Sequence, residues 1–288
     1  MTTSDDALID SGRLRERAPH SGSLAAYIRI GWLNRHLIWQ LVQRDFLARY
    51  RGSLFGIAWS FVTPILLLLI YSFVFGVVFK ARWGAQGQDD VGFVATFYTG
   101  MVVHSIFADA LNRAPSLIVG NPSFVKRIVF PLEILPIVLV TAALITGAIG
   151  IVILLAFNMA SHQTFALTAL FLPIVLAPYL LMILAIVLFV SAVGVYFRDL
   201  GQFIGLVVTA TLFMTPIFYP ISAVPASFRP VMYLNPLTFI VEQARAVILY
   251  GHLPNWSGLA LYAVSAVAAL SLALLWFQKT RKGFADVL

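Results

Sequence analysis

The sequence contains no cysteine and few charged residues. The lack of cysteine among 288 residues excludes disulfides, cysteine-ligated zinc and a thiol nucleophile. Asp, Glu, Lys and Arg together make up 11% of the chain, whereas soluble domains contain about 25% charged residues. Hydrophobic residues make up 60%. This composition predicts a protein that crosses a membrane several times.

The sequence motifs of several enzyme classes are also absent. There is no GxxxxGK[ST] nucleotide loop, so we do not expect this chain to hydrolyse ATP alone. The five histidines are scattered and have no HExxH spacing, which argues against a metal site. No acidic residue lies near the middle of a predicted span, where an ion-coupled transporter normally needs one. We therefore expect no cofactor, metal or catalytic residue in this chain.

The first 53 residues are not expected to span the membrane. Residues 1–23 are polar and lack the apolar core of a signal peptide, so they predict a flexible cytosolic lead. Residues 24–53 predict an N-terminal interface helix without a clean apolar stripe. We expect this helix to lie at the lipid headgroups with one side and to touch protein with the other. A plain membrane-surface helix is the alternative.

Six later stretches are long and apolar enough to cross a bilayer. The first has 26 residues without charge, about 39 Å of helix against a bilayer core of about 30 Å. We therefore predict an all-α membrane protein in which residues 54–288 form the transmembrane domain. The predicted spans are 54–79, 91–111, 134–157, 170–196, 200–219 and 259–277.

Residues 220–257 do not fit a simple span. They contain two apolar pieces divided by Asn235 and Pro236. The second piece is short and carries Glu242 and Arg245, which makes a full crossing unfavourable. We predict re-entrant gate helices that enter and leave the membrane on one side. Glu242 and Arg245 are then either a structural ion pair or part of a gate.

Lysine and arginine residues set the predicted orientation. With six spans and the N-terminus inside, 15 of the 19 Lys and Arg residues lie on the inner side. The positive-inside rule therefore predicts a multi-pass membrane protein with both termini in the cytosol. The net charge of +7 is explained by this asymmetry, and we expect no nucleic-acid partner.

Two groups of charged residues lie near the predicted inner surface. Arg44, Arg49 and Arg51 lead directly into the first span. They are placed either to attract the charged headgroup of a lipid substrate or to hold ordinary membrane lipid. Asp109 and Arg113 lie one helical turn apart near the inner end of the second span, where they are either a structural pair or a gating or coupling pair.

The loop after the second span predicts a short, free-standing helix over residues 121–129. Asn121 is a good N-cap, and Pro122 is tolerated in the first helical position. Lys126 and Arg127 lie near the predicted C-terminal end, where cations suit the helix dipole.

Aromatic residues make up 14% of the chain and recur around the predicted outer ends of the spans. One interpretation is an interfacial aromatic belt together with core packing. The other is a channel whose rings stack on the apolar faces of sugars. The candidates for such a channel or gate are Trp59, Tyr71, Phe97, Tyr98, Phe218, Tyr219 and Tyr233.

Five motifs in order along the chain resemble those of one known family. They are RDFLARYRGS at 44–53, NPSFVK at 121–126, FRDL at 197–200, TPIFYP at 215–220 and NPL at 235–237. The chain is similar to the membrane subunit of bacterial ABC polysaccharide exporters of the O-antigen (lipopolysaccharide) type. Capsule and teichoic-acid permeases are relatives of that type.

The resemblance implies an exporter of the bacterial inner membrane, built from two permeases and two ATPase subunits that would bind ATP and Mg²⁺. It would move undecaprenyl-linked polysaccharide from the cytosol to the periplasm, and the interface arginines would attract the pyrophosphate of the carrier. The helix at 121–129 would be the coupling helix that docks on the ATPase, through Asn121, Pro122, Ser123, Phe124, Lys126 and Arg127.

Two other classes remain as alternatives at this point. A stand-alone or ion-coupled flippase of lipid-linked sugar would work without an ATPase. A membrane-embedded glycosyl- or acyltransferase would need a cluster of Asp, Glu or His at one membrane face, which the sequence does not contain.

Overall fold

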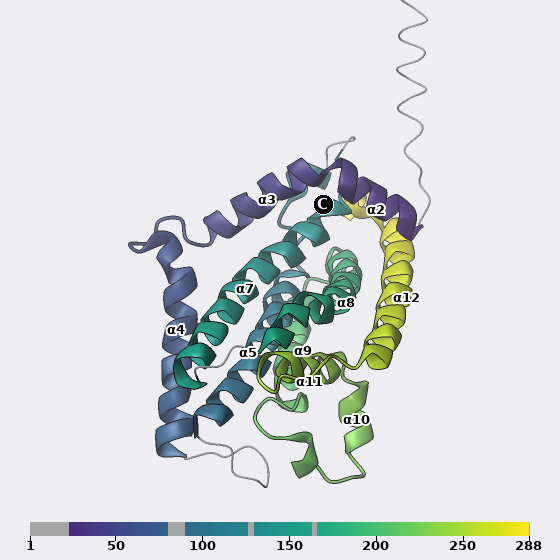
Figure 1. Ribbon diagram of the computed structural model, residues 1–288. Helices are drawn as coiled ribbons and strands as arrows, with labels where there is room; N and C mark the ends of the chain where they lie inside the picture. Colours follow the sequence, from purple (N-terminus) through teal and green to yellow (C-terminus); the bar gives the residue numbers. More distant parts are fainter. Residues whose placement is uncertain (1–22, 80–89, 126–129, 163–165, 288) are drawn as a thin grey trace, which may run out of the picture.

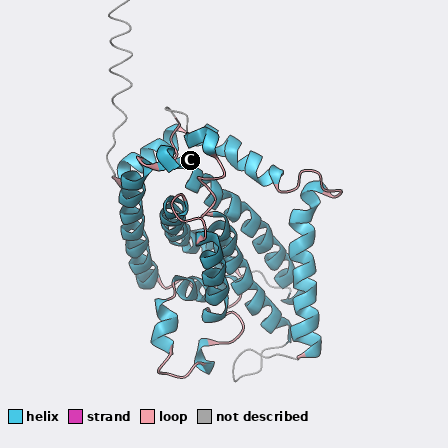
Figure 2. Ribbon diagram, turned by 180° about the vertical axis from the view of Figure 1, so that it is seen from behind, coloured by secondary structure: helices cyan, strands magenta, loops and turns pink. Residues whose placement is uncertain are grey.

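The computed structural model describes residues 23–79, 90–125, 130–162 and 166–287. Within these ranges the chain forms helices joined by loops and contains no strand (Figure 2). The predicted all-α class is therefore confirmed. The predicted lead at 1–23, apart from its last residue, lies outside the described residues, as do Lys126 and Arg127.

The predicted interface helix is divided into α2 (Leu24–Leu33) and α3 (Arg35–Ala48). The hydroxyl of Ser23 caps α2 by accepting a hydrogen bond from the Ala26 N–H at 3.2 Å. Asn34 separates the two helices, and its side-chain amide donates to the Ile30 carbonyl at 2.8 Å. The backbone of Asn34 departs from helical geometry, with φ −99° and ψ 15°, and the chain changes direction there (Figure 1).

The first span runs without interruption from residue 56 to residue 78. It consists of a single 3₁₀ turn, η1 (Gly56–Ala58), then α4 (Trp59–Tyr71) and a π-helical turn, η2 (Ser72–Val78). Pro64 lies inside α4 and cannot donate a backbone hydrogen bond. Only Ser60 and Leu68 of this span are buried within the chain. In Figure 1 it stands at the side of the bundle below α3.

The core of the molecule is built around α5 (Asp90–Arg113). Helix α7 (Ile134–His162) packs closely against it, because Gly147 and Gly150 face Ile106 and Val102 of α5. A β-carbon on Gly147 would lie 2.2 Å from a side-chain carbon of Ile106. Small residues at such positions let two helices approach closely. The turn η3 (Leu167–Phe171), α8 (Leu172–Gly194) and α12 (Trp256–Arg281) complete the bundle.

Five helical segments in the described part of the chain are long and apolar enough to cross a membrane. They correspond to five of the six predicted spans and cover 56–78, 92–113, 134–161, 167–194 and 256–281. The remaining predicted span, 200–219, contains α9 (Leu200–Met214). At about 22 Å, this 15-residue helix is shorter than the bilayer core of about 30 Å. By length and composition, the described helices therefore give five membrane spans rather than the six predicted from the sequence.

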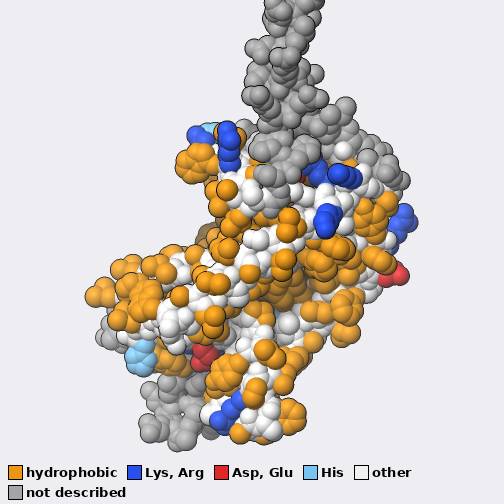
Figure 3. Space-filling model, turned by 90° about the vertical axis from the view of Figure 1, so that its right-hand side faces the viewer, with side chains coloured by type: hydrophobic (Ala, Val, Ile, Leu, Met, Phe, Trp, Pro, Cys, Tyr) orange, Lys and Arg blue, Asp and Glu red, His pale blue; other side chains and the backbone are white. Residues whose placement is uncertain are grey.

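The two ends of the bundle differ in structure. At the α3 end, α2 and α3 arch over the bundle close to the C-terminus and to the short helix α13 (Phe284–Val287) (Figure 1). At the opposite, α11 end lie the turn η4 (Ile221–Ala223), α10 (Arg229–Leu234) and α11 (Pro236–Ile248). Side chains between the ends are mostly hydrophobic, and basic ones gather at the α3 end in the view of Figure 3.

Candidate functional site

The predicted coupling segment contains a short helix, α6 (Pro122–Val125), at the α3 end. Pro122 and Ser123 are exposed, whereas Phe124 and Val125 turn towards the protein. The side chain of Asn121 donates to the Leu117 carbonyl at 2.9 Å, which ties α6 to the preceding turn. One face of the segment is thus anchored, and the other is open.

Phe124 connects this segment to α3. Its ring stacks on Phe130 with a centroid separation of 4.3 Å and an interplanar angle of 8°. The guanidinium carbon of Arg44 lies 5.6 Å from the Phe124 centroid, within range of a cation–π interaction. Phe124 and Phe130 also pack against the apolar cluster that includes Leu41 and Val42 of α3. A displacement of Phe124 therefore acts directly on α3.

Four charged residues join α3 to α5, and we name them the charge square: Asp45 from α3 with Arg49, which caps the C-terminal end of α3 in helical geometry, and Asp109 and Arg113 from α5. Arg49 Nη1 donates to Asp109 Oδ2 at 2.8 Å, and Arg113 Nη2 donates to Asp45 Oδ1. Arg49 Nη1 also lies 3.3 Å from the hydroxyl of Thr146 in α7. The predicted pair of Asp109 and Arg113 is present, but at 3.9 Å its contact is longer than the crossed contact from Arg49.

Asp45 was not among the residues selected from the sequence. Its spacing from Arg49 is the same i,i+4 spacing that identified Asp109 and Arg113, and the two atoms of that pair lie 3.5 Å apart. Arg49, predicted to meet a lipid headgroup, is bound instead to two carboxylates of its own chain. The sequence pattern could have identified each pair, but not the contact between them.

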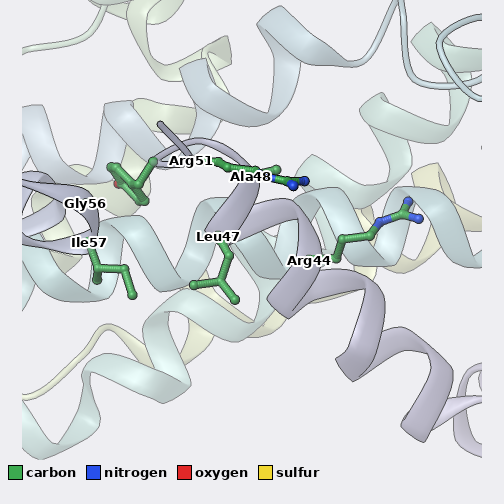
Figure 4. Close-up of a pocket in the computed structure, with 7 residues that line it drawn as sticks. Arg44, Leu47, Ala48, Arg51, Gly56 and Ile57 are labelled. Carbon is green, nitrogen blue, oxygen red and sulfur yellow. The ribbon is translucent and has the colours of Figure 1, made fainter. Parts of the chain in front are cut away.

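Arg44 and Arg51 line an open pocket between the end of α3 and the start of the first span (Figure 4). Its volume is about 310 Å³, and its other lining residues are Leu47, Ala48, Tyr50, Gly56 and Ile57. Gly52 and Gly56 have φ angles of 82° and 50°, which allow the sharp turn that forms one wall. A lining that combines two arginines with apolar residues suits an anionic group attached to a lipid chain.

Arg245 is fully buried at the α11 end and joins three elements. Its Nη1 lies 2.7 Å from both Glu242 Oε1 and the Pro216 carbonyl, and its Nε donates to the Thr96 carbonyl of α5 at 3.0 Å. A β-carbon on Gly100 would come within 3.1 Å of this guanidinium. The predicted pair with Glu242 is therefore present, and the two carbonyl contacts were not foreseen.

The predicted channel aromatics fall into two groups. Phe97 and Tyr98 are 1% and 3% exposed, so in this arrangement they pack inside the bundle. Tyr71 lies edge-on to Phe97 at 4.8 Å, and Phe218 lies 5.3 Å from Phe97. Trp59, Tyr219 and Tyr233 are less buried; Tyr233 is 61% exposed, and the Tyr219 hydroxyl donates to the Phe213 carbonyl at 2.6 Å.

A further contact that the sequence reasoning missed joins the two ends of the chain. Arg281 of α12 pairs with Glu133, which directly precedes α7. Tyr27 of α2 donates its hydroxyl to the Glu133 carbonyl at 3.2 Å. Burial of Tyr27, with a smaller contribution from the nearby Glu133 carboxylate, raises the pKa of its hydroxyl. The phenol thus stays protonated and keeps donating.

Comparison with known proteins agrees with this architecture. A search with family models matches residues 36–249 to the ABC-2 type transporter family. A Myxococcus xanthus protein named O-antigen export system permease protein RfbA is 30% identical over 259 residues, 88% of this chain and 95% of that protein. A Klebsiella pneumoniae protein of the same name is 24% identical over 92% of this chain and all of that protein.

A more distant similarity leads to a second group of transporters. The Escherichia coli polysialic acid transport protein KpsM is 25% identical to this chain over 241 residues, 83% of this chain and 91% of that protein. The family predicted from the five motifs is thus confirmed. The chain belongs to the ABC-2 type transporter family and is a membrane permease, with the ATPase on a separate subunit.

Proposed function

We propose that the chain is the membrane subunit of an exporter that moves lipid-linked polysaccharide, with O-antigen as the first candidate, from the cytosol to the periplasm. The observation that carries this proposal is the match to proteins named O-antigen export permeases over almost the whole length of both chains. Two permeases and two ATPase subunits would form the working unit, and the glycan would travel on an undecaprenyl carrier.

In the proposed orientation, the α3 end of the bundle lies on the cytosolic side of the bacterial inner membrane. Most basic residues of the sequence then lie inside, in agreement with the positive-inside rule. Helix α9 together with the loop that follows it would make the sixth crossing, which brings both termini to the cytosol. Helices α10 and α11 would be periplasmic gate helices, steadied by the contacts of Arg245 with α5 and with the loop after α9.

Residues 121–129 would form the coupling helix that docks on the ATPase. The exposed Pro122 and Ser123 are free to meet a partner, while Phe124 passes movement to α3. Lys126 and Arg127 would add charge to that docking surface.

The pocket beside Arg44 and Arg51 would receive the pyrophosphate of the lipid carrier. It lies where α3 turns into the first span, so a lipid could place its phosphates between the two guanidinium groups and its chain along Leu47 and Ile57. Arg49 is not part of this proposed site, because its guanidinium is paired with Asp45 and Asp109.

The glycan would pass between two copies of the chain. The first span exposes apolar side chains on nearly all sides, and we propose that a second copy of the chain covers part of this surface. Trp59, Tyr71, Phe218, Tyr219 and Tyr233 would face or border the channel, with Phe97 and Tyr98 packed beneath them.

The proposal is tested by purifying the tagged chain in mild detergent and identifying its partners. We expect a stoichiometric ATPase subunit and, after reconstitution into vesicles, ATP-dependent movement of lipid-linked O-antigen. A chain that moves lipid-linked sugar without any ATPase would instead favour the stand-alone flippase.

Capsule export is the second candidate, and the similarity to KpsM favours it. Complementation separates the two substrates. Rescue of a strain that lacks its O-antigen permease supports the first, and rescue of a strain that lacks only its capsule permease supports the second.

A further inference from the structure

The charge square can pair its four charges in two complete ways. In the structure the shorter contacts cross between helices, from Arg49 to Asp109 and from Arg113 to Asp45. The alternative pairs lie within one helix each, Asp45 with Arg49 and Asp109 with Arg113, and their atoms are 3.5 Å and 3.9 Å apart. Every charge keeps a partner of opposite sign in both arrangements.

We propose that the charge square is an exchangeable latch between α3 and α5. Crossed pairing holds α3 against α5, and within-helix pairing releases it. The inference rests on the proposed function of residues 121–129 as the coupling helix, and it adds the route by which their movement reaches the membrane-spanning helices.

The atoms needed for the second arrangement are already in place. Asp45 Oδ2, Arg49 Nη2 and Arg113 Nη1 are shielded from solvent and make no hydrogen bond. These are three of the four atoms that form the within-helix contacts. The i,i+4 spacing lets these pairs close by side-chain rotation alone, without a change in either helix.

Exchange removes the main electrostatic obstacle to separating the two helices. The four side chains are 23–33% exposed, and a charge left without a partner in such a place is strongly destabilising. If only one crossed ion pair joined the two helices, moving α3 away from α5 would leave both of its charges without a partner. Because each helix carries one acid and one base at i,i+4 spacing, releasing α3 replaces the two crossed ion pairs with two within-helix ion pairs.

The latch lies next to the contact that receives the signal. Arg44, over the ring of Phe124, directly precedes Asp45 in α3. When the ATPase moves the coupling helix, the displacement of Phe124 acts on α3 within one residue of the square. Helix α5 forms the centre of the bundle and holds Arg245 through the Thr96 carbonyl, so release at the α3 end can reach the α11 end.

The sharpest test exchanges charges in pairs. Asp45→Arg with Arg113→Asp keeps both crossed pairs but puts like charges four residues apart on each helix, so release is blocked. Asp45→Arg with Arg49→Asp keeps the pair within α3 but makes both crossed contacts repulsive, so the latch cannot close. Exchanging all four residues restores both arrangements and is the matched control.

We measure glycan transport per ATP hydrolysed, with the wild-type chain and its ATPase reconstituted together. Each double exchange is expected to lower that ratio about tenfold or more while hydrolysis continues, and the fourfold exchange is expected to recover most of it. If the variant with intact crossed pairs transports like wild type, the square is a static clamp and the proposal is overturned. If the wild-type assembly itself does not transport, it is the proposed function that fails.

A second measurement does not depend on how well the charge variants fold. The chain has no cysteine, so Gln43→Cys in α3 and Asn112→Cys in α5, both at exposed positions, accept spin labels without background. Assemblies diluted with unlabelled permease would report the distance between the helices by pulsed electron paramagnetic resonance. A second distance that appears with ATP supports the latch, and a single distance in every nucleotide state overturns it.

Discussion

Glu133 and Arg281 form an ion pair between residues 148 positions apart in the sequence, and the two partners differ greatly in burial. The Glu133 side chain is 6% exposed, whereas that of Arg281 is 38% exposed. Together with the hydrogen bond from Tyr27 to the Glu133 carbonyl, the pair joins α2, the start of α7 and the end of α12.

This difference in burial predicts unequal effects of removing each partner. Arg281→Met leaves a carboxylate buried without its partner and should cost about 3 kcal/mol. Glu133→Gln leaves an arginine that reaches water and should cost about 1 kcal/mol. Thermal unfolding in detergent measures both, and the double variant should cost less than the sum. Equal single effects would contradict this account.

Arg245 should not be replaceable by lysine. Its planar guanidinium reaches Glu242 and the carbonyls of Thr96 and Pro216, a set that a lysine ammonium cannot contact in the same geometry. Arg245→Lys should lower stability by about 2–4 kcal/mol and loosen the α11 end. Arg229→Lys is the control, since Arg229 bonds two carbonyls at a more exposed site and should lose less. Hydrogen exchange of α11 reports the loosening.

The close contact between α5 and α7 predicts opposite effects of one substitution at two glycines. Gly147→Ala should destabilise by about 1–3 kcal/mol, because its methyl group would overlap Ile106. Gly205→Ala should be neutral or stabilising by up to about 1 kcal/mol, because nothing lies within 4 Å of that position and alanine favours helix. Unfolding midpoints in the same detergent compare the two.

The aromatic residues should separate by function as they do by burial. Tyr233→Ala removes an exposed ring and should slow glycan export without lowering the unfolding temperature. Phe97→Ala removes a ring from the core and should cost about 3–5 kcal/mol of stability. Unchanged export in Tyr233→Ala and Tyr219→Ala would show that these tyrosines belong to the interfacial aromatic belt and do not act on the glycan.

The coupling helix is tested by reversing its charge. Lys126→Glu with Arg127→Glu should leave the chain inserted and the ATPase active but should uncouple hydrolysis from export, because the proposed docking surface carries the wrong sign. Export and hydrolysis are measured in the same vesicles. Normal export by this variant would exclude these two residues from coupling.

Local patterns predicted the parts of the fold that depend on local physics. Uninterrupted apolar stretches located five spans, and the break at Asn235 and Pro236 correctly separated two apolar pieces. The structure adds that Asn235 caps α11, because its side chain accepts from the Leu237 N–H at 3.0 Å. The i,i+3 spacing of Glu242 and Arg245 identified a real pair. Such signals lie within a few residues of one another and need no knowledge of the tertiary packing.

Contacts between distant elements were not predictable in the same way. Nothing in the local sequence indicates that Arg49 meets Asp109 or that Arg281 meets Glu133. The sequence also does not indicate which aromatic rings are buried. Phe97 and Tyr233 were selected by the same pattern, but Phe97 faces the core and Tyr233 faces the surface. The bend at Asn34 was missed because one asparagine does not by itself interrupt a helical pattern.

The pair of Glu133 and Arg281 has a consequence for the synthesis of the protein. A chain emerges from its N-terminus first, so α2 and Glu133 are made long before Arg281. Until then the Glu133 carboxylate has no basic partner, and α2 packs against a site that still lacks Arg281. Arg281 completes it. A chain that stops short of Arg281 therefore leaves the Glu133 carboxylate without its basic partner.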